Sequence, residues 1–497
     1  MTTPSVSGPS LGQRALYAVL LMVGFYILAL GIAGTLLYLP YAEWHYLGRV
    51  EIRLAVFSLV AAFAILSAVA PRIDRFEAPG PELAPGDHPA LFSLIGQIAT
   101  ATAQARPRHV YLAPDLNAWV AQRGGLMGFG SERVMGVGLP LLQTLSVPEF
   151  SAVLAHEFGH FHGGDTRLGP WIYKTRSAIG RTLAAFSEEH TWLGKPFEWY
   201  GNFFLRITHA VSRQQEYAAD ALAARVVGAA PLASGLKTIH AFGPAFPAFW
   251  ANEVVPVLRA GLRPPLAEGF RQFISAPTVA PQISAVLEQQ LASGTSDPYD
   301  THPPLGERLA ALRSSDAAPP AASAQPAISL LGKADTMEQE LLQHLLPRDV
   351  YEKLEPVGWG ELDHRVWIPR WQQVLLENRD RLEGLGAREL PALADSPGRL
   401  PVRFKLAATP DVATVNAIAE SRFLVGAAVA VALHRRGYSF TALVGEPVIF
   451  TLGSTSFRPF QLIQDLHDGS LSPDAWVALS REAGIADRDF AELTAAN

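Results

Sequence analysis

The chain opens with two long runs of apolar residues that contain no charge. The first run, Ala15–Ala42, exceeds the roughly 20 residues that a helix needs to cross a bilayer. The second run, Leu54–Pro71, follows a short loop and is just long enough to cross. A cleaved signal peptide is the alternative, but the first run is too long for one and no clear cleavage site follows it. The pattern therefore predicts a transmembrane hairpin whose two ends lie on the same side.

Amphipathic patterns follow a Pro/Gly-rich tether at Pro79–Asp87. The best-defined helix begins at Ser146, where Glu149 completes a capping box. An apolar stripe at spacings of three and four follows, and Gly163-Gly164 is predicted to end the helix, so that residues 156 and 160 lie within it. The stripe consists of Phe150, Val153, Leu154 and Phe158. Other patterns predict helices over Ala90–Ala103, Phe203–Val227 and Leu305–Arg313. Strands are predicted over Arg108–Leu112, Asn117–Gln122 and Arg133–Gly138.

The C-terminal third has weaker patterns. Its helix over Val412–Arg435 contains an apolar stretch, Phe423–Leu433, that is too short to span a membrane and therefore predicts a buried helix. The aromatic-rich segment before it, Ala229–Pro298, is interpreted as core, with the wall of a groove as the alternative. Further helices are predicted over Thr336–Leu346, Trp371–Glu383 and Phe460–His467, and a hairpin over Tyr438–Val444 and Pro447–Leu452.

These patterns predict an α+β protein in four parts. They are a membrane anchor with two transmembrane helices (1–75), a mainly helical domain with a small β-sheet (76–313), a linker (314–330) and an α+β domain of unknown role (331–497). The 497 residues are 49% hydrophobic, and the net charge of −6 gives no nucleic-acid signature. The absence of cysteine excludes disulfides and thiolate chemistry.

The stretch His156-Glu-Phe-Gly-His160 carries the first candidate chemistry. Two imidazoles four residues apart on a helix share one face, so their nitrogens can converge on one ion. Glu157 can then reach a metal-bound water without being a ligand itself. So short a motif also arises by chance, in which case the two histidines are merely solvated or bonded within the core. A second cluster downstream favours the metal site.

That second cluster is Ser212-Arg-Gln-Gln-Glu-Tyr-Ala-Ala-Asp220. A catalytic zinc site has three protein ligands and one open position, and Glu216 can supply the third ligand. Asp220, one turn further on, can accept the second ring N–H of a ligand histidine and fix its tautomer. A solvated acidic face is the alternative, but the neighbouring residues are largely apolar.

Five blocks of the chain resemble the membrane-associated zinc metallopeptidases typified by HtpX, the CAAX-prenyl protease and the mitochondrial inner-membrane stress protease. The resemblance covers roughly Pro107–Leu312, and the blocks follow the family's order. They are Asn117-Ala-Trp119, Gly138-Leu-Pro-Leu-Leu142, Ala155-His-Glu-Phe-Gly-His160, Ser212–Asp220 and Thr301-His-Pro-Pro-Leu-Gly-Glu-Arg308. The resemblance implies a zincin-type metallopeptidase domain of the HExxH…E type.

Residue by residue, the resemblance implies that His156, His160 and Glu216 bind one zinc ion per chain and that Glu157 is catalytic. His302 matches a family histidine that approaches the metal, where it can stabilise an oxyanion or bind the metal of an idle site. Otherwise His302 is a loop residue.

Two further interactions are predicted around this site. The resemblance suggests that Asn117, Ala118 and Trp119 lie on a strand edge that binds an extended peptide, with an ordinary hairpin strand as the alternative. Arg308 is predicted to pair with a buried carboxylate such as Asp220.

The charges around the membrane segments indicate the topology. Basic residues flank the open end of the hairpin slightly more than its loop, which favours a cytoplasmic catalytic domain, and the resemblance to HtpX points to a bacterial inner membrane in the same orientation. Some family members have a second pair of membrane helices after the metal helix. Here the corresponding stretch, Trp192–Val211, is interrupted by charge, so it is interpreted as buried or interfacial. The charged residues are Lys195, Glu198 and Arg206.

The sequence therefore predicts a membrane-anchored zinc endopeptidase whose partners are the lipid bilayer and a polypeptide substrate. By resemblance to the quality-control members, that substrate is a membrane protein or a misfolded one. Processing of prenylated peptides is less favoured, because the helices that would build its chamber are not evident. The alternative is a membrane-tethered scaffold with an idle or structural zinc site, but a structural site has no use for Glu157. No sequence feature assigns an oligomeric state.

Overall fold

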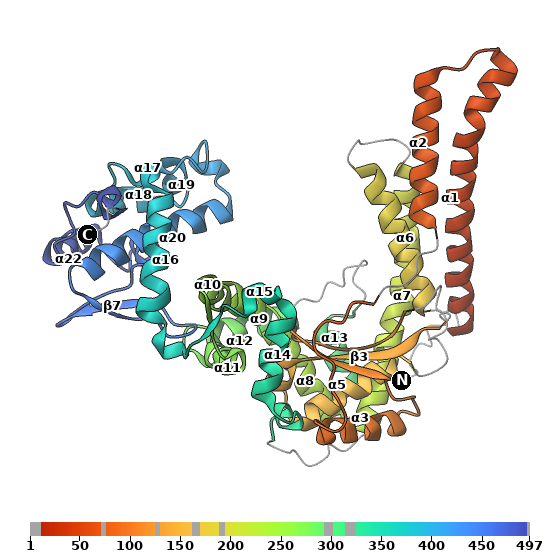
Figure 1. The fold of residues 1–497 in the computed structure, drawn as a ribbon, viewed down its shortest axis with the longest axis horizontal. Coiled ribbons are helices and arrows are strands. Elements are labelled where there is room, and N and C mark those ends of the chain that lie inside the picture. The colour runs from red at the N-terminus through yellow and green to blue at the C-terminus, as the bar shows by residue number, and fades with distance from the viewer. Residues whose placement is uncertain are drawn as a thin grey trace, which may run out of the picture. The chain divides into compact units, whose positions relative to one another are not determined.

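In the computed structural model, the described residues are 11–70, 76–124, 130–161, 169–187, 194–292, 302–313 and 325–494. They are mostly helical, with an N-terminal pair of apolar helices and small sheets (Figure 1). The chain divides into two compact units. Unit 1 consists of Met1–Ala241 and Val286–Leu345, and unit 2 of Phe242–Ala285 and Leu346–Asn497.

Helices α1 (Leu11–Leu47) and α2 (Ile52–Val69) form the predicted hairpin. In the described part of the chain, three helices are long and apolar enough to cross a membrane: the Val19–Leu47 part of α1, α2, and α20 (Val415–Arg435). The hairpin has many exposed apolar side chains, as lipid-facing helices do. By contrast, α20 is buried within unit 2 from Leu424 to Leu433, in agreement with the predicted buried helix.

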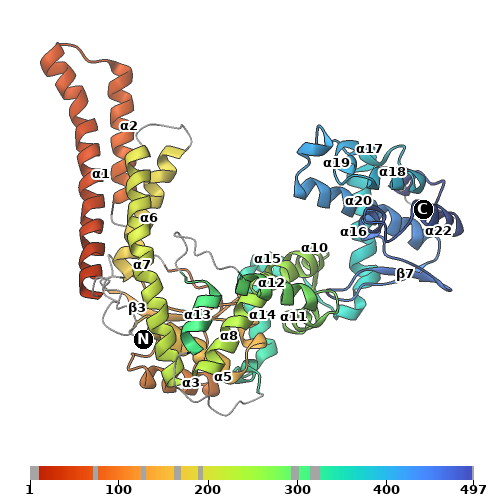
Figure 2. The ribbon, with the colours of Figure 1, turned by 180° about the vertical axis from the view of Figure 1, so that it is seen from behind.

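A second helical pair, α6 (Gly169–Ser187) and α7 (Lys195–Val226), packs along the hairpin (Figures 1 and 2). The Tyr200 hydroxyl donates to the Leu21 carbonyl at 2.5 Å, and the Arg181 guanidinium donates to the Ala68 carbonyl at 2.9 and 3.0 Å. The prediction that the long helix starts at Phe203 is wrong, because its first two turns are stabilised by packing against α1. The four helices share an apolar core of Met22, Phe25, Ala29, Ala33, Leu36, Ala61, Ala62, Ile65, Val69, Ala178, Ile179, Phe197 and Phe204.

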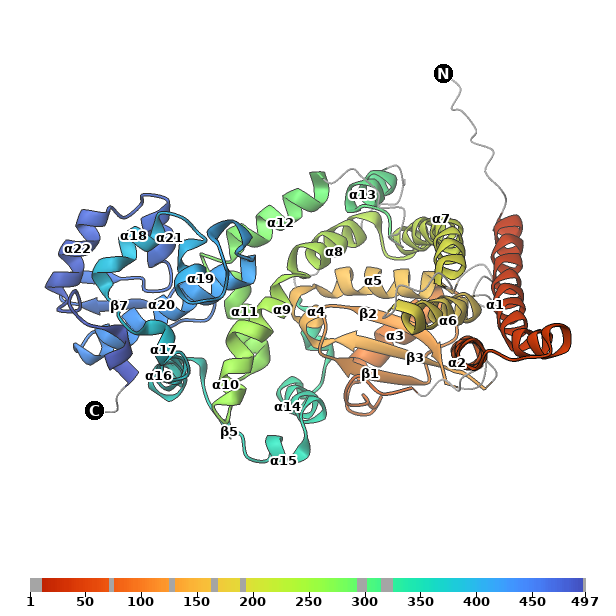
Figure 3. The same cartoon turned by 90° about the horizontal axis from the view of Figure 1, so that it is seen from above.

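The three predicted strands are confirmed within one or two residues as β1 (His109–Ala113), β2 (Ala118–Arg123) and β3 (Glu132–Gly138). The central strand β3 is parallel to β1 and antiparallel to β2. Helix α5 (Val147–Gly159) runs beside the sheet (Figure 3) and shares a core with it and with α3 (Pro89–Ala101). Unit 1 also contains α4 (Leu139–Thr144), α8 (Ala229–Phe242, whose last residue falls in unit 2), α13 (Leu305–Arg313), α14 (Ala334–Leu345) and most of α12 (Ala280–Ala292).

Residues 325–345 pack within unit 1. The Ala327 amide donates to the Leu145 carbonyl at 2.8 Å, and the Val147 amide donates to Gln325 at 3.0 Å, so this segment pairs with the chain entering α5. Leu341 of α14 is buried in the same core. The division into units therefore differs from the predicted boundaries at 314–330 and 331, of which 314–324 lie outside the described residues.

Unit 2 joins the C-terminal region to an earlier excursion of the chain, Phe242–Ala285. The Phe249 ring is fully buried, 5.5 to 5.8 Å from the rings of Phe270, Phe273 and Trp359, so the aromatic-rich segment is core, as predicted. The predicted hairpin is present, and a third strand extends it. The main elements are α9 (Ala245–Phe249), α10 (Val255–Arg259), α11 (Leu266–Ser275), α15 (Arg348–Tyr351), α16 (Ile368–Glu377), α17 (Arg379–Leu382), α18 (Leu390–Ala394), α19 (Arg399–Arg403), β6 (Ser439–Thr441), β7 (Ile449–Leu452), β8 (Thr455–Phe457), α21 (Leu462–His467) and α22 (Pro473–Glu482), with the short pair β4 (Leu262–Arg263) and β5 (Glu355–Pro356).

Candidate metal centre

Helix α5 begins at the predicted cap. The Glu149 carboxylate accepts hydrogen bonds from the Ser146 amide at 2.8 Å and from its hydroxyl at 2.7 Å. The side chains of Phe150, Leu154 and Phe158 are fully buried and fix the rotation of the helix about its axis. That rotation turns both histidines of the motif toward α7.

The position of His160 differs from the prediction. Helix α5 ends at Gly159, and His160 is its C-cap, so only His156 lies inside the helix. The last turn tightens, since the Phe161 amide bonds the Phe158 carbonyl. The predicted stop at Gly163-Gly164 lies outside the described residues. The cap residue is still helical in conformation, so the two rings meet, with centroids 4.7 Å apart.

Glu216 of α7 meets both histidines. Glu216 Oε2 lies 3.5 Å from His156 Nε2, and Glu216 Oε1 lies 3.6 Å from His160 Nε2. Ligand atoms around a tetrahedral zinc ion with bonds of about 2.0–2.1 Å are about 3.3–3.4 Å apart, so each of these two separations is close to that of a pair of zinc ligands. Glu216 Oε2 is buried and accepts no hydrogen bond from the described residues, as expected of an oxygen reserved for a metal.

Behind the histidines, Asp220 lies between His156 and Arg308. Its Oδ1 is 2.8 Å from His156 Nδ1, which leaves Nε2 directed toward Glu216. Arg308 of α13 donates two hydrogen bonds to Asp220, at 2.7 and 2.8 Å, and its Nη1 is 3.6 Å from Glu216. All four side chains are at least nine-tenths buried. The predicted Arg308–Asp220 pair is confirmed.

These contacts set the ionisation of the metal-free site. Burial lowers the pKa of His156, but its contact with the Asp220 carboxylate and the nearby negative charge of Glu216 outweigh burial and raise that pKa to about 9. Burial lowers the pKa of His160 to about 4. Burial raises the pKa of Asp220, but its bonds to Arg308 and His156 prevail and hold it at about 2. Burial raises the pKa of Glu157 to about 7.

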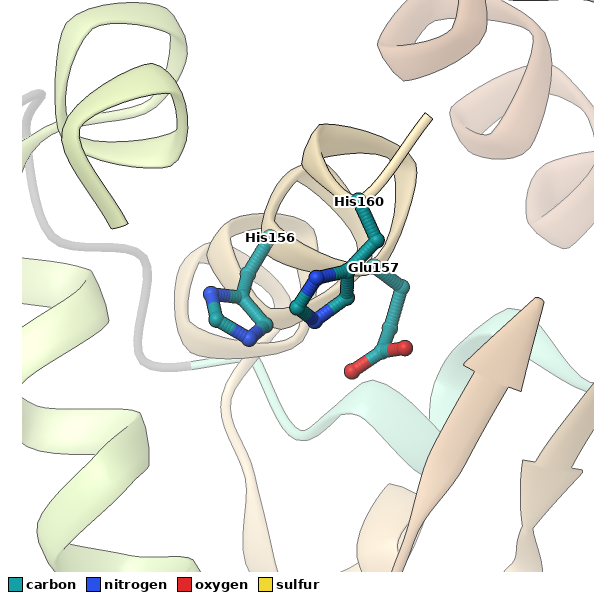
Figure 4. A group of neighbouring side chains, drawn as sticks. All are labelled: His156, Glu157 and His160. Carbon is teal, nitrogen blue, oxygen red and sulfur yellow. The ribbon is translucent and has the colours of Figure 1, made fainter. Parts of the chain in front are cut away.

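Glu157 and His302 complete the group of polar residues. Figure 4 shows the Glu157 carboxylate beside the two histidine rings and directed toward the strands. His302 Nε2 lies 3.5 Å from Glu216 Oε1, and its side chain is 60% exposed, so it borders the site from the solvent side. The fold therefore brings together His156, Glu157, His160, Glu216, Asp220 and His302, as the sequence predicted.

Strand β2, which carries Ala118 and Trp119, is an edge of the sheet. The other edge, β1, is covered by residues 81–83, because the Leu83 amide donates to Val110 and the Leu112 amide to Pro81. The Trp119 ring lies over Gly136, where a Cβ would come within 2.3 Å of it, so this ring covers the outer face of the sheet. Asn117 precedes β2, and its carbonyl accepts from the Gly138 amide at 2.8 Å.

Sequence reasoning missed two contributions to the site. The first is the contact of Arg308 with Glu216, which makes one cation serve both carboxylates. The second is the 2.9 Å hydrogen bond from the Tyr217 hydroxyl to Glu307, which ties α13 to α7. Both contacts could have been predicted from the spacing of Glu216, Tyr217 and Asp220 on one helix together with the adjacent Glu307 and Arg308 of the terminal motif.

Part of the chain is similar to known proteins. Residues 91–316 match the profile of peptidase family M48. Protease HtpX of Klebsiella pneumoniae is 25% identical over 254 residues, which are 46% of this chain and 73% of that protein. Protease HtpX homolog 1 of Saccharolobus solfataricus is 36% identical over 104 residues, 20% of this chain and 32% of that protein. The crystal structure of S. mikatae Ste24p aligns with 59% of this chain and 67% of its own at 18% identity, with a TM-score of 0.24.

Proposed function

Because the chain carries a domain of peptidase family M48 at residues 91–316, we propose that it is a membrane-anchored, zinc-dependent endopeptidase. The observation that carries the proposal is the convergence of His156, His160 and Glu216 from two helices, with Glu157 beside them. One zinc ion per chain accounts for the three ligands and for the buried Glu216 oxygen that accepts no hydrogen bond within the described residues.

In this mechanism, Asp220 holds His156 in the tautomer that presents Nε2 to the metal. Zinc, when bound, lowers the pKa of a water molecule and polarises the scissile carbonyl. Glu157 accepts the proton of the attacking water and passes it to the leaving amine. His302, at the exposed side of the site, donates a hydrogen bond to the developing oxyanion.

The position of β2 at the edge of its sheet supports a polypeptide substrate. Hydrogen-bonded pairs alternate along an antiparallel ladder, and Asn117 bonds Gly138. The amides of Ala118, Val120 and Gln122 therefore point away from β3, toward this edge. An extended peptide paired there would be held through its main chain, with little dependence on its sequence.

The membrane helices support a substrate that is itself a membrane protein. The HtpX names of the relatives support the same class, and by analogy we propose a role in protein quality control at a bacterial inner membrane, with the site in the cytoplasm. No described feature calls for nucleic acid.

The test is cleavage of an unfolded protein and of a membrane protein by detergent-purified enzyme. Glu157→Gln should retain zinc, measured by elemental analysis, and lose cleavage by at least a hundredfold. His156→Ala should lose both. Glu198→Gln, an exposed carboxylate on α7, is the matched control and should match wild type. Cleavage by Glu157→Gln at the wild-type rate would refute the mechanism, and zinc binding without any cleavage by wild type would favour the scaffold alternative.

A further inference from the structure

We propose that α7 acts as a spacer that fixes the distance between the bilayer and the metal centre. The protein would then cleave a membrane protein only where the cut lies at least about six to eight residues from the substrate's membrane-embedded segment. This inference rests on the proposed peptidase function and adds a geometric rule for its substrates.

The two hairpin helices differ in length, so they cannot both end at the bilayer surface. The candidate membrane span of α1, Val19–Leu47, is 29 residues and α2 is 18 residues, about 43 and 27 Å. At about 27 Å, α2 is shorter than a hydrocarbon core of about 30 Å, so it does not extend past that core. Only Gly48–Glu51 join the two helices, so the C-terminal end of α1 and the N-terminal end of α2 lie at the same depth, on the side of the bilayer away from the metal centre. The first part of α1, about 16 Å, therefore extends beyond the end of α2 on the catalytic side.

This extension of α1 packs against the start of α7. The rings of Phe25 and Phe197 are 6.5 Å apart, and the Tyr200 hydroxyl bonds the Leu21 carbonyl. Gly24 makes room for this contact, since a Cβ there would come within 2.5 Å of the Tyr200 oxygen. The packing joins α7 firmly to the membrane anchor.

The exposed face of α7 marks the bilayer surface. Lys195, Glu198 and Arg206 are exposed there, and charged side chains are costly in the hydrocarbon core. Between them, Trp199 is 69% and Phe203 is 44% exposed, with their rings stacked at 6.0 Å. Exposed aromatic rings among charges are typical of the membrane–water interface. The interface therefore lies at the level of Trp199 to Phe203.

From that level, α7 continues as one unbroken helix to the metal centre. Glu216 is 13 residues after Phe203 and 17 after Trp199, which is about 20 to 25 Å along the helix. Figures 1 and 2 show α7 running in the direction of α6 and the hairpin, so most of this length separates the site from the bilayer. A fully extended chain covers 3.3–3.6 Å per residue, so a substrate needs about six to eight residues to reach the site.

The test uses the full-length protein in liposomes and a ladder of substrates. Each substrate has one transmembrane helix, a spacer of 2 to 14 residues and a cleavage cassette. The position of the cut is mapped first in the soluble cassette without the helix, so that the spacer is counted from the helix to the cut. Cleavage should begin at about six to eight residues and rise at least tenfold across that step, while the soluble cassette is cut throughout. Glu157→Gln serves as the blank.

The outcomes separate the two proposals. Equal cleavage at spacers of 2 and 14 residues would overturn the spacer rule and leave the peptidase function intact. Failure to cut even the soluble cassette would refute the peptidase function, and the rule with it. A second measurement does not depend on activity: the chain has no cysteine, so spin labels at Asn202→Cys and Ala221→Cys report depth directly. Oxygen should relax the first label, and a water-soluble nickel complex the second. A lipid-exposed label at residue 221 would also overturn the rule.

Discussion

Replacing Arg308 by Met should destabilise unit 1 more in the metal-free protein than in the zinc-loaded one. The Arg308 side chain is 5% exposed and gives two hydrogen bonds to Asp220, and its Nη1 lies 3.6 Å from Glu216. Methionine fills a similar volume without charge. The substitution therefore removes one positive charge from beside two buried carboxylates and leaves only His156, whose pKa is raised to about 9, to compensate them.

The size of the effect follows from this burial. Removing one partner of a buried ion pair costs about 3–5 kcal/mol, because the other charge stays desolvated. For a domain of this size that is a fall of about 6 to 20 °C in the midpoint of thermal unfolding. Zinc returns positive charge to Glu216 and polarises His156 against Asp220, so the loss should be smaller when zinc is bound.

Thermal unfolding in detergent, with chelator and with zinc, measures both values. Arg308→Lys keeps the charge without the paired geometry and should lose less than Arg308→Met. The double variant Asp220→Asn/Arg308→Met should recover part of the loss, with a coupling of about 2–3 kcal/mol in the metal-free protein. A coupling below about 0.5 kcal/mol, or an equal loss with and without zinc, would refute the reasoning.

Two further predictions concern the same site. Gly159→Ala puts a Cβ within 2.8 Å of the Ala219 backbone and should push α5 away from α7, which should lower the free energy of unfolding by about 1–3 kcal/mol and weaken zinc binding at least tenfold. The control Gly180→Ala, on open helix surface, should change neither quantity. Equal zinc titrations for the two variants would contradict this prediction. Zinc binding at pH 7.5 should release about one proton and strengthen as the pH rises toward 9, because the raised pKa of His156 keeps this histidine protonated until zinc displaces the proton. Asp220→Asn should reduce the number of protons released. Calorimetry in buffers of different ionisation enthalpy measures the proton release, and binding heats that do not depend on the buffer would exclude the displacement of a proton from His156.

Local patterns predicted the elements whose determinants lie close together in the sequence. The Ser146–Glu149 cap and the stripe on α5 specify one helix, and Leu305–Arg313 was predicted to the residue. These features depend on spacing within one or two turns, which a single sequence displays. The meeting of Glu216 and Asp220 with the distant histidines was predicted instead from the number of ligands that a catalytic zinc site needs and from the family resemblance.

Features that depend on distant packing were not visible. The charges at the start of α7 obscured its first turns, whose apolar side, Phe197 and Phe204, is buried only because α1 lies beside it. The segment 325–345 was divided between the linker and the C-terminal domain, because its partners, at Leu145–Val147, are far away in the sequence. Similarly, nothing local assigns Phe242–Ala285 to the second unit, since its aromatic rings meet Trp359 across a long gap.

The divided origin of unit 2 has a consequence for how this protein is made and how it can be altered. Residues 242–285 leave the peptidase sequence between Glu216 and His302, yet they supply core to a unit whose remainder is synthesised last. A chain released before Trp359 would have its proposed metal ligands complete and a row of phenylalanines uncovered. Such a product would be a ready target for aggregation. Unit 2 therefore could not have been added or lost by a single insertion or deletion at its C-terminal segment, because the coding sequence for Phe242–Ala285 would also have to change.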